Sequence, residues 1–167
     1  MRIIRNTNLS DLSEINEIYA YARQFMKESG NPTQWGDNRP SPSAIEKDIR
    51  TKNSYVVLEN DKIIGVFSFI NGHDETYDVI EEGAWLNDEP YGVIHKIAGA
   101  PNAHGILADA LEFAGTQVTN LRIDTHKNNT VMQHLLSKAG FQYCGIIYTD
   151  DGTKRLAYQK IINNTQG

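Results

Sequence analysis

Apolar residues recur every three to four positions between residues 8 and 30, a spacing typical of a helix with one buried face. Asn8 and Asp11 form a candidate capping pair at its start, and Gly30 is a natural stop. After a stretch rich in proline, Ser41 and Pro42 open a second, shorter helix that ends near residue 50. The first third of the chain therefore predicts two helices, preceded by a short strand at residues 2–5.

The rest of the chain alternates between strand and helix patterns. Two strands around an Asn60–Asp61 turn are predicted between residues 55 and 70. Further strands are predicted at residues 77–86 and 91–99, at 121–125, and in a hairpin over 143–161 that turns at 150–152. Helices are predicted from Gly105 to about residue 117 and from Asn129 to Gly140.

These elements define a mixed α/β protein (α+β in arrangement) whose central sheet is mostly antiparallel, because hairpins dominate its connections. The strands on either side of the helix at Gly105 should be parallel, joined by a right-handed crossover. We expect about six to seven strands flanked by about four helices. The sequence shows no repeat or linker, which predicts one domain over residues 1–162 and a frayed tail at 163–167.

Composition and charge narrow the class of protein. The chain of 167 residues has a formal net charge of −5 and no basic run, which argues against nucleic acid as a partner. No apolar run approaches the ~20 residues of a membrane span, and the first residues lack the apolar core of a signal peptide. Cys144 is the only cysteine, so no intrachain disulfide can form. We expect a cytoplasmic protein without a membrane partner.

The stretch APNAHGILADALEFAG, residues 100–115, predicts a loop that leads into a helix at Gly105. Backbone N–H groups and the helix dipole converge at such a junction, which makes it a candidate phosphate site. The stretch contains no arginine or lysine. Any phosphate here would therefore be held by main-chain donors.

The order of elements, together with the segments VIHKIAG, HGIL and LRIDTHKNNTVMQHLLSKAGF, resembles the GCN5-related N-acetyltransferase (GNAT) superfamily. The likeness spans nearly the whole chain, and its most specific part is NNTVMQHLLSKAGF at residues 128–141. WLNDEPYGVIHKIA, at residues 85–98, resembles a pattern in bacterial members of unassigned substrate. The resemblance implies acetyl-CoA as the acetyl donor and a primary amine, on a small molecule or a peptide, as the acceptor.

The resemblance also implies which residues contact the cofactor. A strand edge along the pantetheine arm, a phosphate loop and the start of a helix would contribute the following residues: Ile97, Ala98, Gly99, Asn102, Ala103, His104, Gly105, Ile106, Leu107, Ala108, Asn129 and Met132. Pairing of the arm with a strand edge uses main-chain groups and tolerates sequence change. For Asn129, an N-cap of the following helix is an equally good interpretation.

Two departures from the family pattern weaken the expected site. In the phosphate loop only Gly105 is kept, no arginine is present, and Leu107 is bulkier than the place usually allows. At the position where many members have a tyrosine acid, this chain has Leu136, which cannot donate a proton. A thiolate leaves without much help, since the pKa of a thiol is near 8.5.

The reaction also needs a base that frees the amine of its proton. His95 is the first candidate, because it alternates with Ile97 on the strand near the expected carbonyl site. The unperturbed pKa of histidine, near 6.5, suits a base that works around neutral pH. The alternative is a core histidine satisfied by its neighbours. Glu81 and Glu82 compete for the role, with one expected to point to each face of a strand. Tyr148 could replace the missing acid.

Trp35 and Trp85 are candidates for an acceptor pocket, with core packing as the alternative for both. We expect no metal, because the five histidines show no pair at a ligand spacing with confirming carboxylates. Edge strands in this fold commonly pair, which allows a homodimer. The alternative function is a catalytically silent acyl-CoA binder that senses its ligand. A plain interaction protein that has lost the cofactor is the third possibility.

Overall fold

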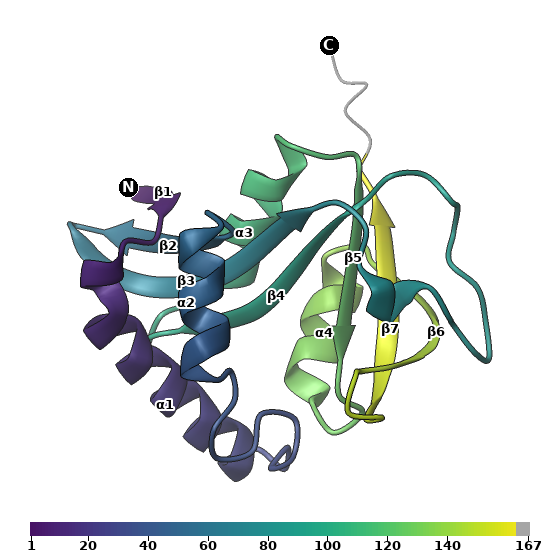
Figure 1. Ribbon diagram of the computed structural model, residues 1–167, viewed down its shortest axis with the longest axis horizontal. Helices are drawn as coiled ribbons and strands as arrows, with labels where there is room; N and C mark the ends of the chain where they lie inside the picture. Colours follow the sequence, from purple (N-terminus) through teal and green to yellow (C-terminus); the bar gives the residue numbers. More distant parts are fainter. Residues whose placement is uncertain (163–167) are drawn as a thin grey trace. The chain divides into compact units, whose positions relative to one another are not determined.

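The computed structural model describes residues 1–162, with four α-helices and seven strands in that range (Figure 1). In chain order these are β1 (Arg2–Asn6), α1 (Leu12–Glu28), α2 (Pro42–Arg50), β2 (Ser54–Glu59), β3 (Lys62–Asn71), β4 (Gly92–Gly99), α3 (Ile106–Gly115), β5 (Asn120–Thr125), α4 (Thr130–Lys138), β6 (Gln142–Tyr148) and β7 (Lys154–Ile161). Short 3₁₀ turns occupy Leu9–Asp11 and Glu75–Tyr77. The expected tail at 163–167 lies outside the described residues.

The strands form one sheet in the order β1-β2-β3-β4-β5-β7-β6. β4 and β5, on either side of α3, are parallel. The pairs β1–β2, β2–β3, β5–β7 and β6–β7 are antiparallel. The expected mixed, mostly antiparallel sheet is confirmed.

The chain divides into two compact units. The first consists of Met1–Ile70 and Ile94–Phe113, and the second of Asn71–Val93 and the described residues from Ala114 onward. Each unit has its own core and is described by itself below.

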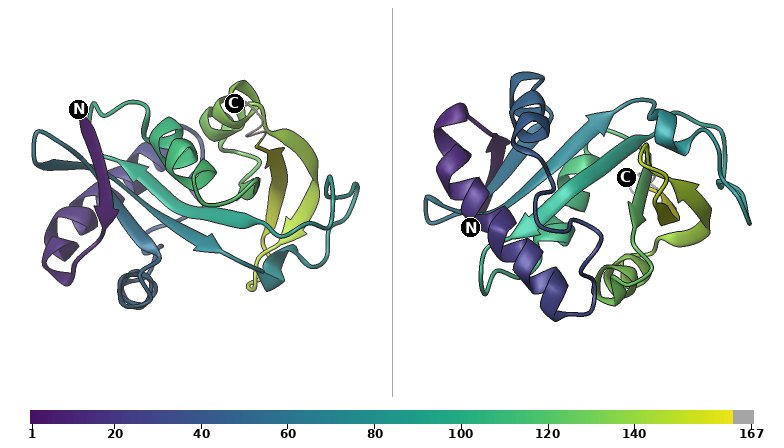
Figure 2. Two further views of the ribbon diagram at one scale, coloured as in Figure 1. Left: turned by 90° about the horizontal axis from the view of Figure 1, so that it is seen from above. Right: turned by 60° about the horizontal axis from the view of Figure 1, so that its bottom comes forward.

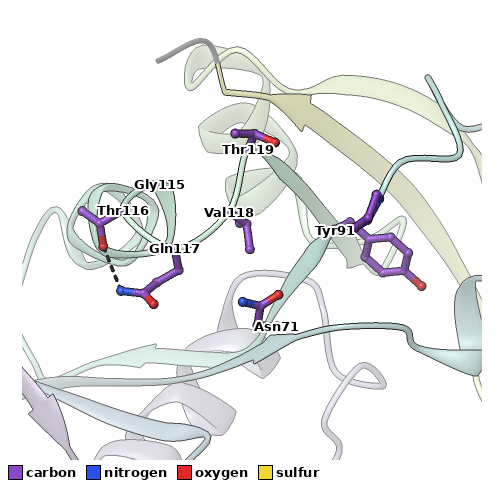
Figure 3. A pocket seen from close by; sticks show the side chains of 8 residues that line it. Asn71, Tyr91, Gly115, Thr116, Gln117, Val118 and Thr119 are labelled. Carbon is purple, nitrogen blue, oxygen red and sulfur yellow. Dashed lines mark hydrogen bonds between the residues drawn. The ribbon is translucent and has the colours of Figure 1, made fainter. Parts of the chain in front are cut away.

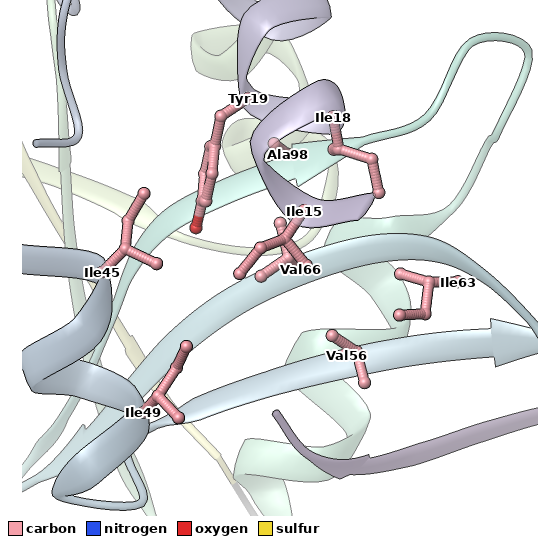
Figure 4. Close-up of a cluster of buried hydrophobic side chains, with 9 residues drawn as sticks. All are labelled: Ile15, Ile18, Tyr19, Ile45, Ile49, Val56, Ile63, Val66 and Ala98. Carbon is pink, nitrogen blue, oxygen red and sulfur yellow. The ribbon is translucent and has the colours of Figure 1, made fainter. Parts of the chain in front are cut away.

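In the first unit, side chains alternate between the two faces of β2 and β3. Val56 and Val66 pair across the strands and pack under α1 and α2, in a cluster drawn in Figure 4. Tyr55 and Phe67, the next pair across the two strands, stack at 5.5 Å between ring centroids and meet Phe113 of α3. The period of two therefore places α1 and α2 on one face and α3 on the other, as the left view of Figure 2 shows.

The predicted starts of the first two helices are confirmed. The backbone N–H of Asn8 donates to the Asp11 carboxylate at 2.8 Å. Arg5 also donates to that carboxylate and lowers its pKa. At α2, Ser41 Oγ accepts from the Ala44 N–H at 3.2 Å, and Pro42 follows at the first helical position.

The second unit is built around a buried arginine. The guanidinium of Arg122 lies 4.2 Å from the ring centroid of Trp85 and 4.0 Å from that of Tyr91, and it donates to the carbonyl of Asn87 at 2.9 Å. Burial lowers its pKa. The fully buried Gln159 accepts from the Leu86 N–H at 2.9 Å. These contacts fix residues 85–91, just before β4, which are neither helix nor strand.

The strand predicted at residues 77–86 is wrong. This segment has a 3₁₀ turn and a single antiparallel bridge, Glu81 to Ile146. The aromatic residues that suggested a strand, Tyr77 and Trp85, instead contact each other at 5.2 Å between centroids in the core of the second unit. Tertiary packing of two large rings outweighs the local strand pattern.

Candidate functional site

The loop between β4 and α3 has two residues with left-handed backbone, Asn102 at φ +66° and Gly105 at φ +80°. The N–H of Ala103 donates to the carbonyl of Ala100 at 3.0 Å, which closes a tight turn. The N–H of Asp109 donates to the carbonyl of Gly105 at 3.0 Å, which starts the helix. Gly105 thus provides the backbone conformation that lets the loop enter α3.

Arg2 contacts this loop, a contact that the sequence analysis did not anticipate. Its Nη1 donates to the carbonyl of His104 at 2.6 Å and to the Asp109 carboxylate at 2.7 Å. The carbonyl and the N–H of one peptide point in opposite directions, so the N–H of Gly105 points away from Arg2. The arginine therefore holds the orientation of a peptide that is a candidate phosphate donor, and it neutralises an acid in the first turn of the helix.

Ile106 and Leu107 are buried, at 6% and 8% exposure. Ile106 packs so tightly on β3 that a Cβ built at Gly65 would lie 2.7 Å from its Cδ1. Leu107, whose bulk departs from the family pattern, has its side chain buried in the core. These two residues can offer a ligand only their main chain. Asn102, His104 and Ala108 are exposed.

On β4, His95, Lys96 and Ile97 are half-buried, and Ala98 is buried. Lys96 has φ +52°, in the left-handed region, in the middle of the strand. This residue interrupts the regular alternation of faces, so the expectation that His95 and Ile97 share one face loses its basis. His95 remains a candidate base on its place in β4.

Tyr148 and Glu81, two of the candidates, are brought together in the second unit. Tyr148 Oη donates to Glu81 Oε1 at 3.3 Å. Glu82 is exposed and has φ +54°. The expectation that these glutamates alternate on a strand is wrong, since the segment is not a strand, but an acid–carboxylate pair at the end of β6 is present.

The two tryptophans lie in different units and both make core contacts. Trp35 meets Tyr19 edge-on at 5.7 Å between centroids, at the border of the core under α1. Trp85 Nε1 donates to the carbonyl of Tyr77 at 2.9 Å. Both remain partly exposed. Core packing, the alternative for each, is thus present, and the acceptor pocket remains a prediction.

At the start of α4, Asn129 is the N-cap: its Oδ1 accepts from the N–H of Met132 at 3.0 Å. Met132 is half-buried on the first turn, and Leu136 is fully buried one turn later. The residue that replaces the family tyrosine thus belongs to the core of the second unit. The capping interpretation of Asn129 is confirmed, and its contact with a cofactor remains a prediction.

His126, in the turn before α4, is buried and its pKa lies below the ordinary value of 6.5, first because of burial and then because of Arg155. Its Nδ1 accepts a hydrogen bond from the N–H of Asn128 at 3.1 Å. A protonated imidazole cannot accept this bond, because both of its ring nitrogens carry protons.

The unfolded chain therefore takes up a proton on His126 near pH 6.5, where the folded chain does not. Protonation favours unfolding, so the free energy of unfolding should fall as the pH drops below about 6.5. His126→Gln should flatten this dependence, which urea melts between about pH 5 and 7.5 would measure. An identical pH dependence in the variant would contradict the assignment.

A cavity of about 360 Å³ lies in the second unit (Figure 3). Its lining is Asn71, Pro90, Tyr91, Gly115, Thr116, Gln117, Val118 and Thr119. None of the residues expected from the sequence lines it. In Figure 3 the Gln117 amide hydrogen-bonds Thr116 at 3.1 Å and does not reach a partner across the cavity.

Within residues 1–162, no group of three or more histidines, cysteines or acids is placed to hold a metal ion. His73 pairs with Asp78 at 2.5 Å on the surface, which raises the pKa of the histidine. No helix in the same range is long and apolar enough to cross a membrane.

Solved structures share the arrangement of these elements. A GNAT-family acetyltransferase from Streptococcus agalactiae is 34% identical, with a TM-score of 0.86 over 98% of this chain and 96% of its own. Ribosomal-protein-alanine N-acetyltransferase from Brucella melitensis is 20% identical, with a TM-score of 0.63 over 96% and 99%. The yncA protein from Salmonella typhimurium, solved with its cofactor acetyl-CoA, is 14% identical, with a TM-score of 0.63 over 99% and 96%.

The likeness to the Brucella and Salmonella proteins, at 20% and 14% identity, shows the fold alone. The family model of the acetyltransferase (GNAT) domain matches residues 2–142. The chain belongs to the GNAT family of acetyltransferases. No curated protein matches the sequence.

Proposed function

We propose that this protein is an acetyl-CoA-dependent N-acetyltransferase that moves an acetyl group to a primary amine of a small molecule or a peptide by direct attack. The observation that carries the proposal is the family match over residues 2–142, which includes the loop and helix start at Gly105. A protein of the same fold was solved with its cofactor acetyl-CoA. Residues 1–162 would act as one domain in the cytoplasm.

The loop fits a phosphate through its main chain. Gly105 has the left-handed backbone of the turn, and Arg2 orients the peptide before it. The N–H groups at the start of a helix of ten residues lie next to this turn. His104 and Ala108 would supply further main-chain donors, whereas the N–H of Ala103 already donates to the Ala100 carbonyl.

Acetyl-CoA supplies the acetyl group as a thioester. His95 would accept the proton of the attacking amine, because a neutral imidazole is the base best matched to neutral pH. Main-chain N–H groups near Ile97 would stabilise negative charge on the carbonyl oxygen. Tyr148 would return a proton to the leaving thiolate, with Glu81 as its hydrogen-bond partner.

Calorimetry with acetyl-CoA and a thiol-release assay over a panel of primary amines test the proposal. Binding together with amine-dependent thiol release supports the enzyme. Binding without turnover on any amine favours the silent acyl-CoA binder, for which buried Leu136 in place of the family tyrosine is the specific observation. Absence of binding contradicts both.

Gly105→Pro should weaken CoA binding by ~1.5–3 kcal/mol, about one hydrogen bond to a charged group. Proline removes the N–H and cannot adopt φ +80°. Gly152→Pro is the matched control, since Gly152 has φ +82° and lies in the β6–β7 turn. Unchanged CoA affinity in folded Gly105→Pro would place the phosphates elsewhere.

A further inference from the structure

Lys96 has a left-handed backbone at φ +52° in the middle of β4. For a residue other than glycine, such a conformation costs on the order of 1–3 kcal/mol and persists only where the surroundings fix it. In an extended strand neither a turn nor a chain end accounts for it. The strain therefore points to contacts that hold this one residue.

Two side chains from other elements of the first unit contact Lys96, and a third supports one of them. Tyr19 of α1 donates its hydroxyl to the Lys96 carbonyl at 2.8 Å. Lys96 Nζ donates to Asp48 Oδ2 of α2 at 2.7 Å, and Ser68 Oγ of β3 donates to the same oxygen at 2.7 Å. The main chain and the side chain of Lys96 are thus both fixed.

Three of the four side chains in this network are buried, and Lys96 itself is half-buried. Tyr19 is 2% exposed, Asp48 7% and Ser68 2%, and burial raises the pKa of the Tyr19 hydroxyl so that it stays a donor. A buried ion pair adds little net stability compared with well-packed apolar residues, since desolvation offsets its attraction. In Figure 4, Tyr19 and Ala98 lie beside apolar side chains of the same core cluster. The polar residues Tyr19, Asp48 and Ser68 are therefore better explained by their role in fixing the backbone conformation of Lys96.

The carbonyl of Lys96 points to Tyr19, so the N–H of the same peptide, which belongs to Ile97, points the opposite way. That N–H is one of the main-chain donors near the expected carbonyl site. A donor to a developing oxyanion must be held before the reaction begins, because reorientation would cost part of the stabilisation.

We propose that Tyr19 and Asp48 are positioning residues that hold left-handed Lys96 and thereby aim the Ile97 N–H at the acetyl carbonyl oxygen. The inference rests on the proposed function. Neither side chain touches the substrate: Tyr19 acts through the carbonyl of Lys96, and Asp48 acts through the ammonium group of Lys96.

The test uses acetyl-CoA labelled with ¹³C at the carbonyl and the infrared stretch of that group when bound. In the wild type the hydrogen bond from the Ile97 N–H should lower the stretching frequency of the carbonyl relative to that of free acetyl-CoA. Tyr19→Phe and Asp48→Leu should move it back and slow thiol release by ~10–100-fold, with CoA affinity unchanged. Loss of packing alone would not move the carbonyl stretch.

A rescue separates geometry from folding. Glycine adopts the left-handed region without strain, so Lys96→Gly should keep the wild-type stretch and should restore it in Asp48→Leu. Lys96→Val should lose it, because a β-branched residue is the most strained there. Lys52→Val is the control, since Lys52 has φ +61° in the turn after α2, far from β4 in the sequence.

The outcomes separate the two claims. Wild-type protein that does not bind acetyl-CoA overturns the proposed function and this inference with it. Protein that binds acetyl-CoA but shows no shift of the stretch, or the same shift in folded Tyr19→Phe and Asp48→Leu, overturns the inference alone.

Discussion

His95→Gln should lower the rate of acetyl transfer per bound substrate by ~10²–10⁴-fold while CoA affinity stays within about twofold. Glutamine keeps the size and some hydrogen bonding of the half-buried histidine but cannot accept the amine proton.

His134→Gln is the control, since His134 is exposed on α4. The measurement is thiol release under single-turnover conditions, with acetyl-CoA affinity from calorimetry. Normal turnover in His95→Gln would move the role to Glu81, Glu82 or water. An unfolded variant would identify His95 as a satisfied core histidine, which was the alternative from the sequence.

Much of the fold follows from local pattern. The period of two in β2 and β3 separates Val56 from Tyr55, and the structure places them on the two faces that carry α1 and α3. The parallel pair β4 and β5 follows from the single helix between two strands. These features depend on neighbours in sequence, and a sequence pattern reports such neighbours well.

The contacts that shape the candidate site depend on distant residues instead. Arg2 reaches the loop at His104 from 102 positions away in the sequence. Lys96 is fixed by side chains from α1 and α2, and nothing in the string IHKIA marks a left-handed residue. The bulk of Leu107 departs from the family pattern, and its side chain is buried in the core of the first unit. Periodicity carries no information on such contacts.

The segment before β4 shows the same limit. Apolar residues at 77–86 suggested a strand, yet only one bridge forms. The N–H of Ala84 donates to the Cys144 carbonyl at 2.9 Å, and Glu81 and Ile146 exchange two backbone hydrogen bonds at 2.8 Å. Gly83 and Gly145 lie in this contact. The absence of side chains at both positions lets the two backbones approach. In the sequence these two glycines look no different from the others, so the contact could not be predicted from them.

Gly83→Ala should therefore destabilise the protein by about 3 kcal/mol or more, at the upper end of the effect of overpacking. A Cβ built at Gly83 would lie 1.9 Å from the Cys144 carbonyl oxygen, which is backbone and cannot rotate away. The bridge would have to separate, and Glu81 would leave Tyr148.

Gly115→Ala is the matched control, because its Cβ would make only ordinary contacts with Ile162, at 3.6 Å from Cδ1 and 3.9 Å from Cγ2. Urea melts of the two variants measure the difference. Equal stability of the two variants would show that the segment shifts freely. Glu81 would then lose its fixed place beside Tyr148, and the proposed proton donor would have to act without a carboxylate partner.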